Sequence, residues 1–227
     1  MVPLWFYTTK RDKLSLSCSV NSNEIVKGDG FYVVNNILSE ECRRNIVDMF
    51  LPSTSKERQL NSDVEFEFYT DTNFTRQLSE VFGKDLYPVN SLDMQRCWLR
   101  YYYQGMKSNY YENMHHDKKR YGPGVKQYRL IIPIHDTSDT KFHIEPDISF
   151  RFSQNMGILI EAGNCKHRVD FNRGERLVLI MDFTTKQCDS IWGHYSCRGI
   201  IGYIWWIIDL IWRKLSSIYY SISNRTT

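Results

Sequence analysis

The sequence predicts one α+β domain with a mainly β core, because helix-like segments come first and a run of short strands follows. From about residue 94 onward, short apolar segments alternate with Gly and Pro turns, which is typical of a β-sandwich or barrel. Aromatic residues make up 15% of the chain, including 15 Tyr, and they favour strands over a helical bundle. A length of 227 residues suits a single large β domain.

The first elements expected are a strand and two helices. The β-branched and aromatic stretch 31–34 predicts a strand. Ser39 is a good N-cap for a helix over about 40–50, which two Glu in its first turn support and Pro52 ends. Apolar residues at helical spacing predict a second helix within 72–82, ended by Gly83. We expect both helices to buttress a sheet.

The second half of the chain predicts six successive strands. They are expected over 94–103, 127–134, 149–152, 157–162, 165–169 and 176–183. A Gly-Pro-Gly sequence at 122–124 predicts a mobile loop beside the site described below.

Charge and cysteine usage set the expected environment. A net charge of +3 is too small to argue for nucleic acid or an acidic substrate, and the basic stretch 118–120 is expected to be a solvated loop. The six Cys show no CxxC pair, so we expect reduced thiols in an intracellular, cytoplasmic protein. The N-terminus has no basic region followed by an apolar run, so no signal peptide is expected.

The most apolar stretch of the chain is its tail, over 199–212. It has fourteen residues and contains Asp209, which is short of the roughly twenty apolar residues that a spanning helix needs. Three Trp with basic flanks suit an interfacial membrane anchor, and a helix that packs on the core or forms a homodimer contact is the alternative.

Four polar residues predict a metal centre. Residues at i and i+2 of a strand share a face, so His115 and Asp117 are expected on one side and His116 on the other. His167 follows about fifty residues later. Two imidazoles and a carboxylate suit non-haem Fe(II), and Arg176 nine residues further on could bind a dicarboxylate through its guanidinium fork.

The order of these motifs resembles the Fe(II)/2-oxoglutarate-dependent dioxygenase superfamily over roughly 31–185. The segment 31–42 looks like the opening of prolyl 4-hydroxylase-like members, and 128–133 with 179–183 is similar to the aspartyl/asparaginyl hydroxylase-like branch. Some members of that branch lack the acidic ligand, whereas Asp117 is present here. The motifs, in chain order, are Leu99-Arg100-Tyr101-Tyr102-Tyr103-Gln104-Gly105, His115-His116-Asp117, Gly157-Ile158-Leu159-Ile160-Glu161, His167-Arg168-Val169 and Gly174-Glu175-Arg176-Leu177-Val178-Leu179.

The resemblance implies a double-stranded β-helix, or jelly roll, with the metal at one mouth. His115, Asp117 and His167 would be the Fe(II) ligands, and Arg176 would pair with the distal carboxylate of 2-oxoglutarate. The catalytic domain would be 31–185, between an N-terminal extension (1–30) and the apolar tail (186–227). Fe(II) and the co-substrate 2-oxoglutarate are the implied cofactors, and ascorbate is a candidate for a third.

Two further residues match the superfamily, each with a plain alternative. Tyr102 matches a tyrosine that could hydrogen-bond the same carboxylate, or it packs within a strand. Arg129 matches an arginine that contacts co-substrate or substrate in the aspartyl/asparaginyl branch, or it is a surface ion-pair partner.

A rival metal set, His143 with Glu145, lies only twenty-two residues before His167. That interval is short for the strands that a jelly roll needs between its ligands.

The resulting hypothesis is a hydroxylase that acts on a protein side chain, of prolyl or aspartyl/asparaginyl type, or on a small amino-acid-like molecule. Its co-products would be succinate and CO2. The alternative is a catalytically silent jelly-roll protein that binds a membrane or a partner. A nucleic-acid demethylase of the same superfamily is less favoured, because a net charge of +3 predicts no strongly basic surface.

Overall fold

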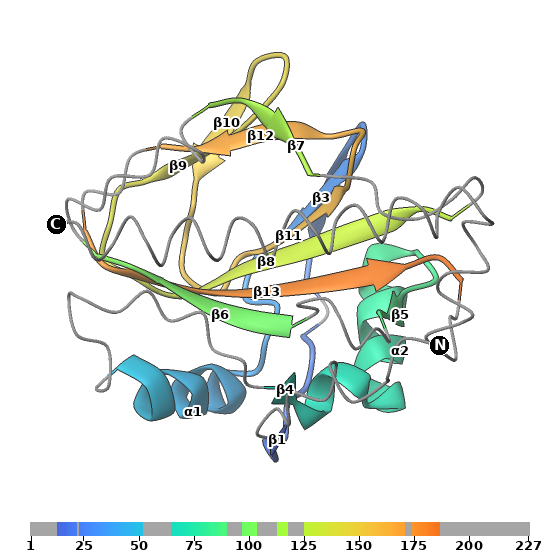
Figure 1. Cartoon of the computed structure of the whole chain (residues 1–227), viewed down its shortest axis with the longest axis vertical. Coiled ribbons are helices and arrows are strands. Elements are labelled where there is room, and N and C mark those ends of the chain that lie inside the picture. Colours follow the sequence, from blue (N-terminus) through green and yellow to red (C-terminus); the bar gives the residue numbers. More distant parts are fainter. Residues whose placement is uncertain are drawn as a thin grey trace, which may run out of the picture.

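Two β-sheets and a pair of helices form three layers (Figure 1). The computed structural model describes residues 13–21, 23–51, 65–89, 97–103, 113–117, 125–170 and 174–186. The larger sheet lies in the middle, the helices cover one of its faces, and the smaller sheet lies over the other face.

The larger sheet has seven strands and the smaller has four, and all pairs within both sheets are antiparallel. The larger sheet runs in the order β2 (Ile25–Gly28), β3 (Phe31–Val34), β11 (Gly157–Glu161), β8 (Gln127–Asp136), β13 (Arg176–Thr184) and β5 (Tyr87–Pro88), and β6 (Cys97–Tyr102) also pairs with β13. The smaller sheet runs in the order β10 (Ile148–Arg151), β9 (Lys141–Ile144), β12 (Lys166–Val169) and β7 (His115–His116). A separate parallel pair joins β1 (Lys13–Leu14) to β4 (Glu65–Phe66).

Both predicted helices are confirmed. In α1 (Glu40–Phe50), the Ser39 hydroxyl caps the first turn by accepting from the Cys42 amide at 3.3 Å. Helix α2 (Thr72–Phe82) follows the short 3-10 turn η3 (Glu67–Thr70) and ends at Gly83, whose φ of 59° is the left-handed conformation expected of a glycine cap.

Strand alternation divides the apolar residues of the larger sheet into two cores. On β8, Leu130, Ile132 and Ile134 pack in the core that includes both helices. Ile131 belongs to the second core, between the two sheets. Arg129 shares this inner face with Ile131, because side chains two residues apart along a strand point the same way.

The jelly-roll prediction is confirmed, since the described chain is mainly β and two antiparallel sheets pack face to face. Strand β8 extends two residues beyond its predicted end, to Asp136. Strand β9 was not predicted, because 141–144 alternates charged and apolar residues over only four positions.

The expectation of reduced thiols is wrong for one pair, since Cys18 and Cys42 form a disulfide. The segment before β2 runs alongside the start of α1, where the Ser39 amide donates to the Ser19 carbonyl at 2.9 Å. This pairing brings together two Cys that are 24 residues apart, with a Cα–Cα distance of 5.0 Å. Cys97 and Cys165 are both buried. The Cys18–Cys42 disulfide gives no support to the predicted intracellular location, which stays a prediction.

Four predictions lie outside the described residues. They concern the solvated basic loop at 118–120, the mobile loop at 122–124, the thiols of Cys188 and Cys197, and the apolar tail at 199–212. Among the helices that the structure does describe, none has the length and apolar character needed to cross a membrane.

Candidate metal site between the two sheets

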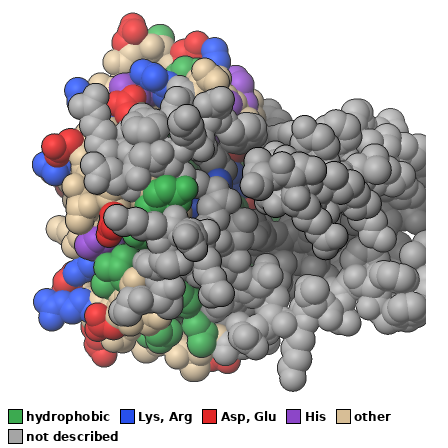
Figure 2. Space-filling model, turned by 60° about the vertical axis from the view of Figure 1, so that its left-hand side comes forward, with side chains coloured by type: hydrophobic (Ala, Val, Ile, Leu, Met, Phe, Trp, Pro, Cys, Tyr) green, Lys and Arg blue, Asp and Glu red, His purple; other side chains and the backbone are tan. Residues whose placement is uncertain are grey.

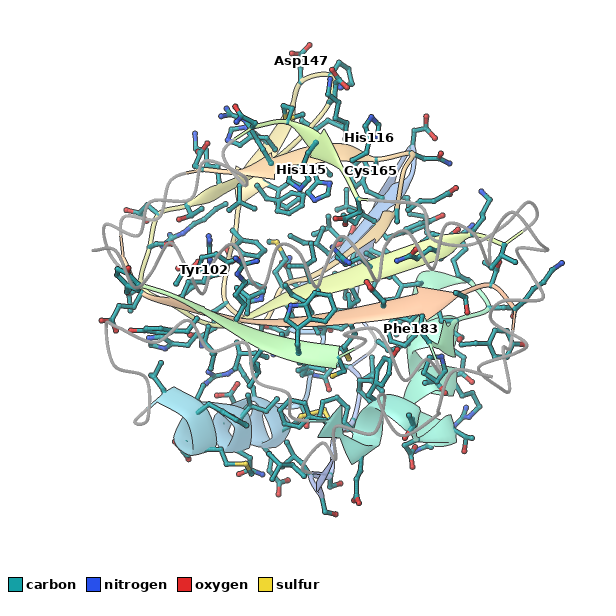
Figure 3. All side chains as sticks on the ribbon, in the orientation of Figure 1. Tyr102, His115, His116, Asp147, Cys165 and Phe183 are labelled. Atoms are coloured by element: carbon teal, nitrogen blue, oxygen red, sulfur yellow. A yellow bond between two sulfur atoms is a disulfide. The ribbon has the colours of Figure 1, made fainter. Side chains whose placement is uncertain are left out.

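The structure brings His115, Asp117 and His167 together at one end of the space between the sheets. His115 on β7 lies directly opposite His167 on β12 in the antiparallel register, and Asp117 follows β7. One potential ligand atom from each residue lies within 4.8 Å of the other two. Figure 3 shows His115 facing the larger sheet and His116 on the outer side, where its side chain is exposed.

Both imidazoles are oriented by backbone carbonyls. The Nδ1 atom of His115 lies 2.9 Å from the Asn113 oxygen, and that of His167 lies 3.2 Å from the Cys165 oxygen. A neutral ring that donates from Nδ1 keeps its Nε2 lone pair for a metal ion. Burial lowers the pKa of His167, against the opposing effect of the Asp117 charge, so the neutral form is favoured.

The two carboxylate oxygens of Asp117 differ in their surroundings. Oδ1 accepts a hydrogen bond from Arg129 at 2.7 Å. Oδ2 is buried without a hydrogen-bond partner in the described part of the chain, and it lies 4.0 Å from Nε2 of His167. A buried anionic oxygen without a donor is costly unless a cation is close to it. With two imidazoles beside it, the donor set fits a divalent transition metal such as Fe(II).

A buried guanidinium lies in the same pocket as the three candidate ligands. Arg176 is 3% exposed, and its Nε and Nη1 atoms have no hydrogen-bond partner among the described residues. Its guanidinium carbon lies 4.5 Å from the ring centre of Tyr102 and 5.1 Å from that of Phe152. Burial lowers the pKa of Arg176, and the nearby Asp136 opposes that effect. Because arginine stays protonated in proteins, the positively charged guanidinium of Arg176 lines the pocket.

All six residues that the sequence singled out line one pocket. Apolar side chains from both sheets complete its wall. The lining residues are Tyr102, His115, Asp117, Arg129, Ile131, Phe142, Phe152, His167, Val169, Arg176, Val178 and Ile180.

The rival set of His143 and Glu145 is not brought together with His167. His143 Nε2 lies 2.7 Å from Asp170 Oδ1, and Glu145 forms an ion pair with Lys166 at 2.8 Å. Neither residue lines the pocket. The structure therefore accounts for both side chains through partners outside the candidate site.

Arg129 is an ion-pair partner in this structure. Its guanidinium contacts Asp182 through Nε at 2.8 Å and through Nη2 at 3.0 Å, in addition to Asp117. Its side chain is 20% exposed, so this pairing is partly buried rather than at the surface. The contact with a co-substrate or substrate stays a prediction.

Sequence reasoning missed Asp182 and Phe152. A signal for Asp182 was present, because an acidic residue within an otherwise apolar strand needs a buried partner. It is 2% exposed and lies opposite Arg129 in the strand register. Phe152 carried no comparable signal, since an aromatic residue at the end of a strand is ordinary.

Comparisons with known proteins give structural similarities only. No protein-family model matches the chain, and no curated protein matches it significantly. Similar solved structures include a prolyl 4-hydroxylase from Phytophthora capsici, with 13% identity, a TM-score of 0.46, and coverage of 70% of this chain and 60% of that one. A prolyl hydroxylase from Trichoplax adhaerens, in complex with a hypoxia inducible factor peptide fragment, has 11% identity, a TM-score of 0.42, and coverage of 69% and 84%.

A further similar structure is an oxidoreductase of the 2OG-Fe(II) oxygenase family from Burkholderia pseudomallei. Its identity is 15% and its TM-score 0.37, with coverage of 76% of this chain and 74% of that one. The fold and the candidate site described above rest on this chain's own strand pairing and side-chain contacts.

Proposed function

We propose that this protein is an Fe(II)- and 2-oxoglutarate-dependent dioxygenase that hydroxylates its substrate. The observation that carries the proposal is the convergence of His115, Asp117 and His167 in a pocket that also contains the guanidinium of Arg176. Two imidazoles and one carboxylate are the facial set of non-haem Fe(II) oxygenases, and they leave coordination positions for a co-substrate and oxygen.

The co-substrate would be held by Arg176, opposite the metal ligands. A guanidinium fork matches a carboxylate through two parallel hydrogen bonds, and the rings of Tyr102 and Phe152 fix its plane. The Tyr102 hydroxyl is a second candidate donor to the same carboxylate. Arg129 is a further candidate contact of the co-substrate or substrate.

When bound, iron and 2-oxoglutarate would use one molecule of O2: one of its oxygen atoms would enter succinate as CO2 is released, and the other would enter the substrate as a hydroxyl group. The chain's own part would be to favour the neutral form of His167, to present the Asp117 oxygen that has no hydrogen-bond partner in the described chain, and to line the pocket with apolar side chains. Charged groups interact more strongly in a partly buried, apolar-walled pocket than in bulk solution.

For the substrate we propose a protein side chain, of prolyl or aspartyl/asparaginyl type, or a small amino-acid-like molecule. Ascorbate is a candidate additional cofactor and belongs in the assay. An intracellular location and a membrane or homodimer contact through 199–212 are also proposals.

Succinate release from 2-oxoglutarate tests the function. Wild-type protein with Fe(II) and a panel of prolyl, aspartyl and asparaginyl peptides should produce succinate, and a chelator should stop production. His115→Ala and His167→Ala should abolish it, whereas the matched control His116→Ala should retain it, because His116 is exposed on the outer side. Succinate production that persists in the His115 and His167 variants would contradict the proposal. Complete silence of metal-loaded wild type would favour the binding-module alternative.

A further inference from the structure

Arg129 connects two carboxylates that come from the two different sheets. Its Nε and Nη2 atoms donate to both oxygens of Asp182 on β13, and its Nη1 donates to Oδ1 of Asp117, which follows β7. We propose that Arg129 is a positioning residue for the metal site. It holds one oxygen of Asp117 so that only the other oxygen is presented to the ion. This inference rests on the proposed metal site and adds a role for a residue outside the ligand set.

The side of Arg129 toward the larger sheet is rigidly held. Asp182 lies directly opposite Arg129 in the register of β8 and β13, and it is 2% exposed. The peptide oxygen of Asp182 also accepts from the hydroxyl of buried Tyr69. Two parallel hydrogen bonds from one guanidinium fix its plane as well as its position. The Trp98 ring, 5.1 Å from the guanidinium carbon, packs on that plane.

The hydrogen bond from Arg129 to Asp117 determines which carboxylate oxygen of Asp117 is available to bind a cation. A carboxylate can bind a metal ion through one oxygen or through both. Here Oδ1 accepts from a charged donor at 2.7 Å, while the buried Oδ2 has no hydrogen-bond partner in the described chain and lies 4.0 Å from His167 Nε2. Arg129 therefore favours binding through Oδ2 alone, which leaves more positions open on the ion.

The charge of Asp182 makes this arrangement compatible with a cation. A lone arginine beside a metal site would repel the ion, because like charges at short range oppose each other. With Asp182 and Asp117 on either side of it, Arg129 belongs to a group with two negative charges and one positive charge. The group therefore keeps a net negative charge of one toward an incoming divalent ion.

A purely structural role makes a different prediction. If Arg129 served only as the counterion of buried Asp182, its loss would lower stability and leave metal binding unchanged in any variant that folds. Removing Arg129 alone would leave a buried carboxylate unpaired, and such a variant can fail to fold. The double variant Arg129→Met/Asp182→Leu removes both charges and keeps apolar volume, so folding and metal binding can be measured separately.

The test is anaerobic titration of the full chain with Co(II), with the dissociation constant and the visible Co(II) spectrum as readouts. The folded double variant should bind about 10- to 100-fold more weakly than wild type and show a changed spectrum. Arg129→Lys should fall between them, since an ammonium cannot serve both carboxylates through a planar fork. Lys126→Ala is the matched control, because Lys126 pairs with Glu161 and lines no part of the pocket. The Co(II) dissociation constant and spectrum of Lys126→Ala should match those of wild type.

An unchanged dissociation constant and spectrum in the folded double variant would overturn the positioning role while leaving the metal site intact. Failure of wild type to bind Co(II) would overturn the metal site as well. The two failures are therefore distinguishable, and neither readout depends on turnover.

Discussion

At the scale of single residues, the guanidinium of Arg176 has the surroundings that most directly suggest a ligand. It lies between two aromatic rings, is 3% exposed, and has two nitrogen atoms without a hydrogen-bond partner among the described residues. Buried donors without acceptors cost free energy unless a ligand accepts from them. An anionic group that enters the pocket would supply those acceptors.

Substitution of Arg176 should therefore separate co-substrate binding from metal binding. Arg176→Lys should weaken 2-oxoglutarate binding by at least about tenfold, since a charge-assisted hydrogen bond contributes about 1.5–3 kcal/mol. Its affinity for Fe(II) should stay within about twofold of wild type. Isothermal titration with 2-oxoglutarate and metal analysis measure the two properties. Arg168→Lys is the control, because Arg168 lies on β12 in the smaller sheet and does not line the pocket. Loss of iron from the Arg176 variant would show that its role is misassigned.

Tyr102 has two candidate roles that one substitution can distinguish. Tyr102→Phe keeps the ring beside Arg176 and removes the hydroxyl. If the hydroxyl binds the co-substrate, the dissociation constant for 2-oxoglutarate should rise about two- to tenfold. Tyr102→Ala should have a larger effect, because the ring that packs on the guanidinium is also lost. Wild-type affinity in Tyr102→Phe would mean that Tyr102 only packs.

The residues of the candidate site divide into those that local pattern can predict and those that it cannot. The i, i+2 spacing of His115 and Asp117 predicts a shared strand face, and the structure shows both residues lining the pocket. Asp182 could not be paired with Arg129 from sequence, because 53 residues separate them and only the strand register places them side by side. Long-range register is set by the packing of the whole sheet.

At the scale of elements, strand alternation accounts for most of the site. The face between the sheets carries the even-numbered residues of β13, from Arg176 to Asp182, and two odd-numbered residues of β8, Arg129 and Ile131. The odd-numbered residues of β13 and the even-numbered residues of β8 pack toward the helices. Pattern also predicted α1 and α2 well, because caps and helical spacing are local signals. The β7 strand, with only two residues, has no periodicity of its own to detect.

The first turn of α1 predicts a pH dependence of stability. Hydrogen bonds from Arg43 and Arg44 lower the pKa of Glu40 from 4.5 to about 2. Since the folded-state pKa is below the unfolded one, the stabilisation is present above about pH 4.5 and is lost as the pH falls toward 2. Glu40→Gln should lower the free energy of unfolding at neutral pH by no more than about 1 kcal/mol, because Glu40 is half exposed.

Urea unfolding between about pH 7 and pH 3 measures this effect. The difference between Glu40→Gln and wild type should shrink as the pH falls. The exposed neighbour Glu41, changed to Gln, is the control and should differ less from wild type. A difference for Glu40→Gln that is equal at both ends of the range would exclude the ion pairs as its cause.

The disulfide predicts a redox dependence of stability. Cys18→Ser opens a link across 24 residues and should lower the free energy of unfolding by about 3 kcal/mol. Wild type treated with dithiothreitol should fall to the same stability, because it loses the same link. Thiol titration before and after reduction counts the cysteines involved. If the reductant leaves wild-type stability unchanged, Cys18 and Cys42 are not bonded in the protein as purified.

At the scale of the whole molecule, three layers place the pocket between two sheets and away from the helices. On the face in Figure 2, Lys and Arg side chains of the described residues are interspersed with Asp and Glu rather than gathered in one basic patch. With a net charge of +3, this pattern gives no support for nucleic acid as a substrate. Substrate identity depends on segments around the pocket mouth, and sequence pattern carries little information on such loops.

The most direct test of the central claim is the stoichiometry of anaerobic Fe(II) binding to the full chain. We expect one ion per chain for wild type and for the His116→Ala control. We expect no tightly bound ion for Asp117→Ala or His167→Ala, in protein that circular dichroism shows to be folded. Binding of one Fe(II) per chain that survives loss of Asp117 and His167, or no binding by wild type, would contradict the central claim.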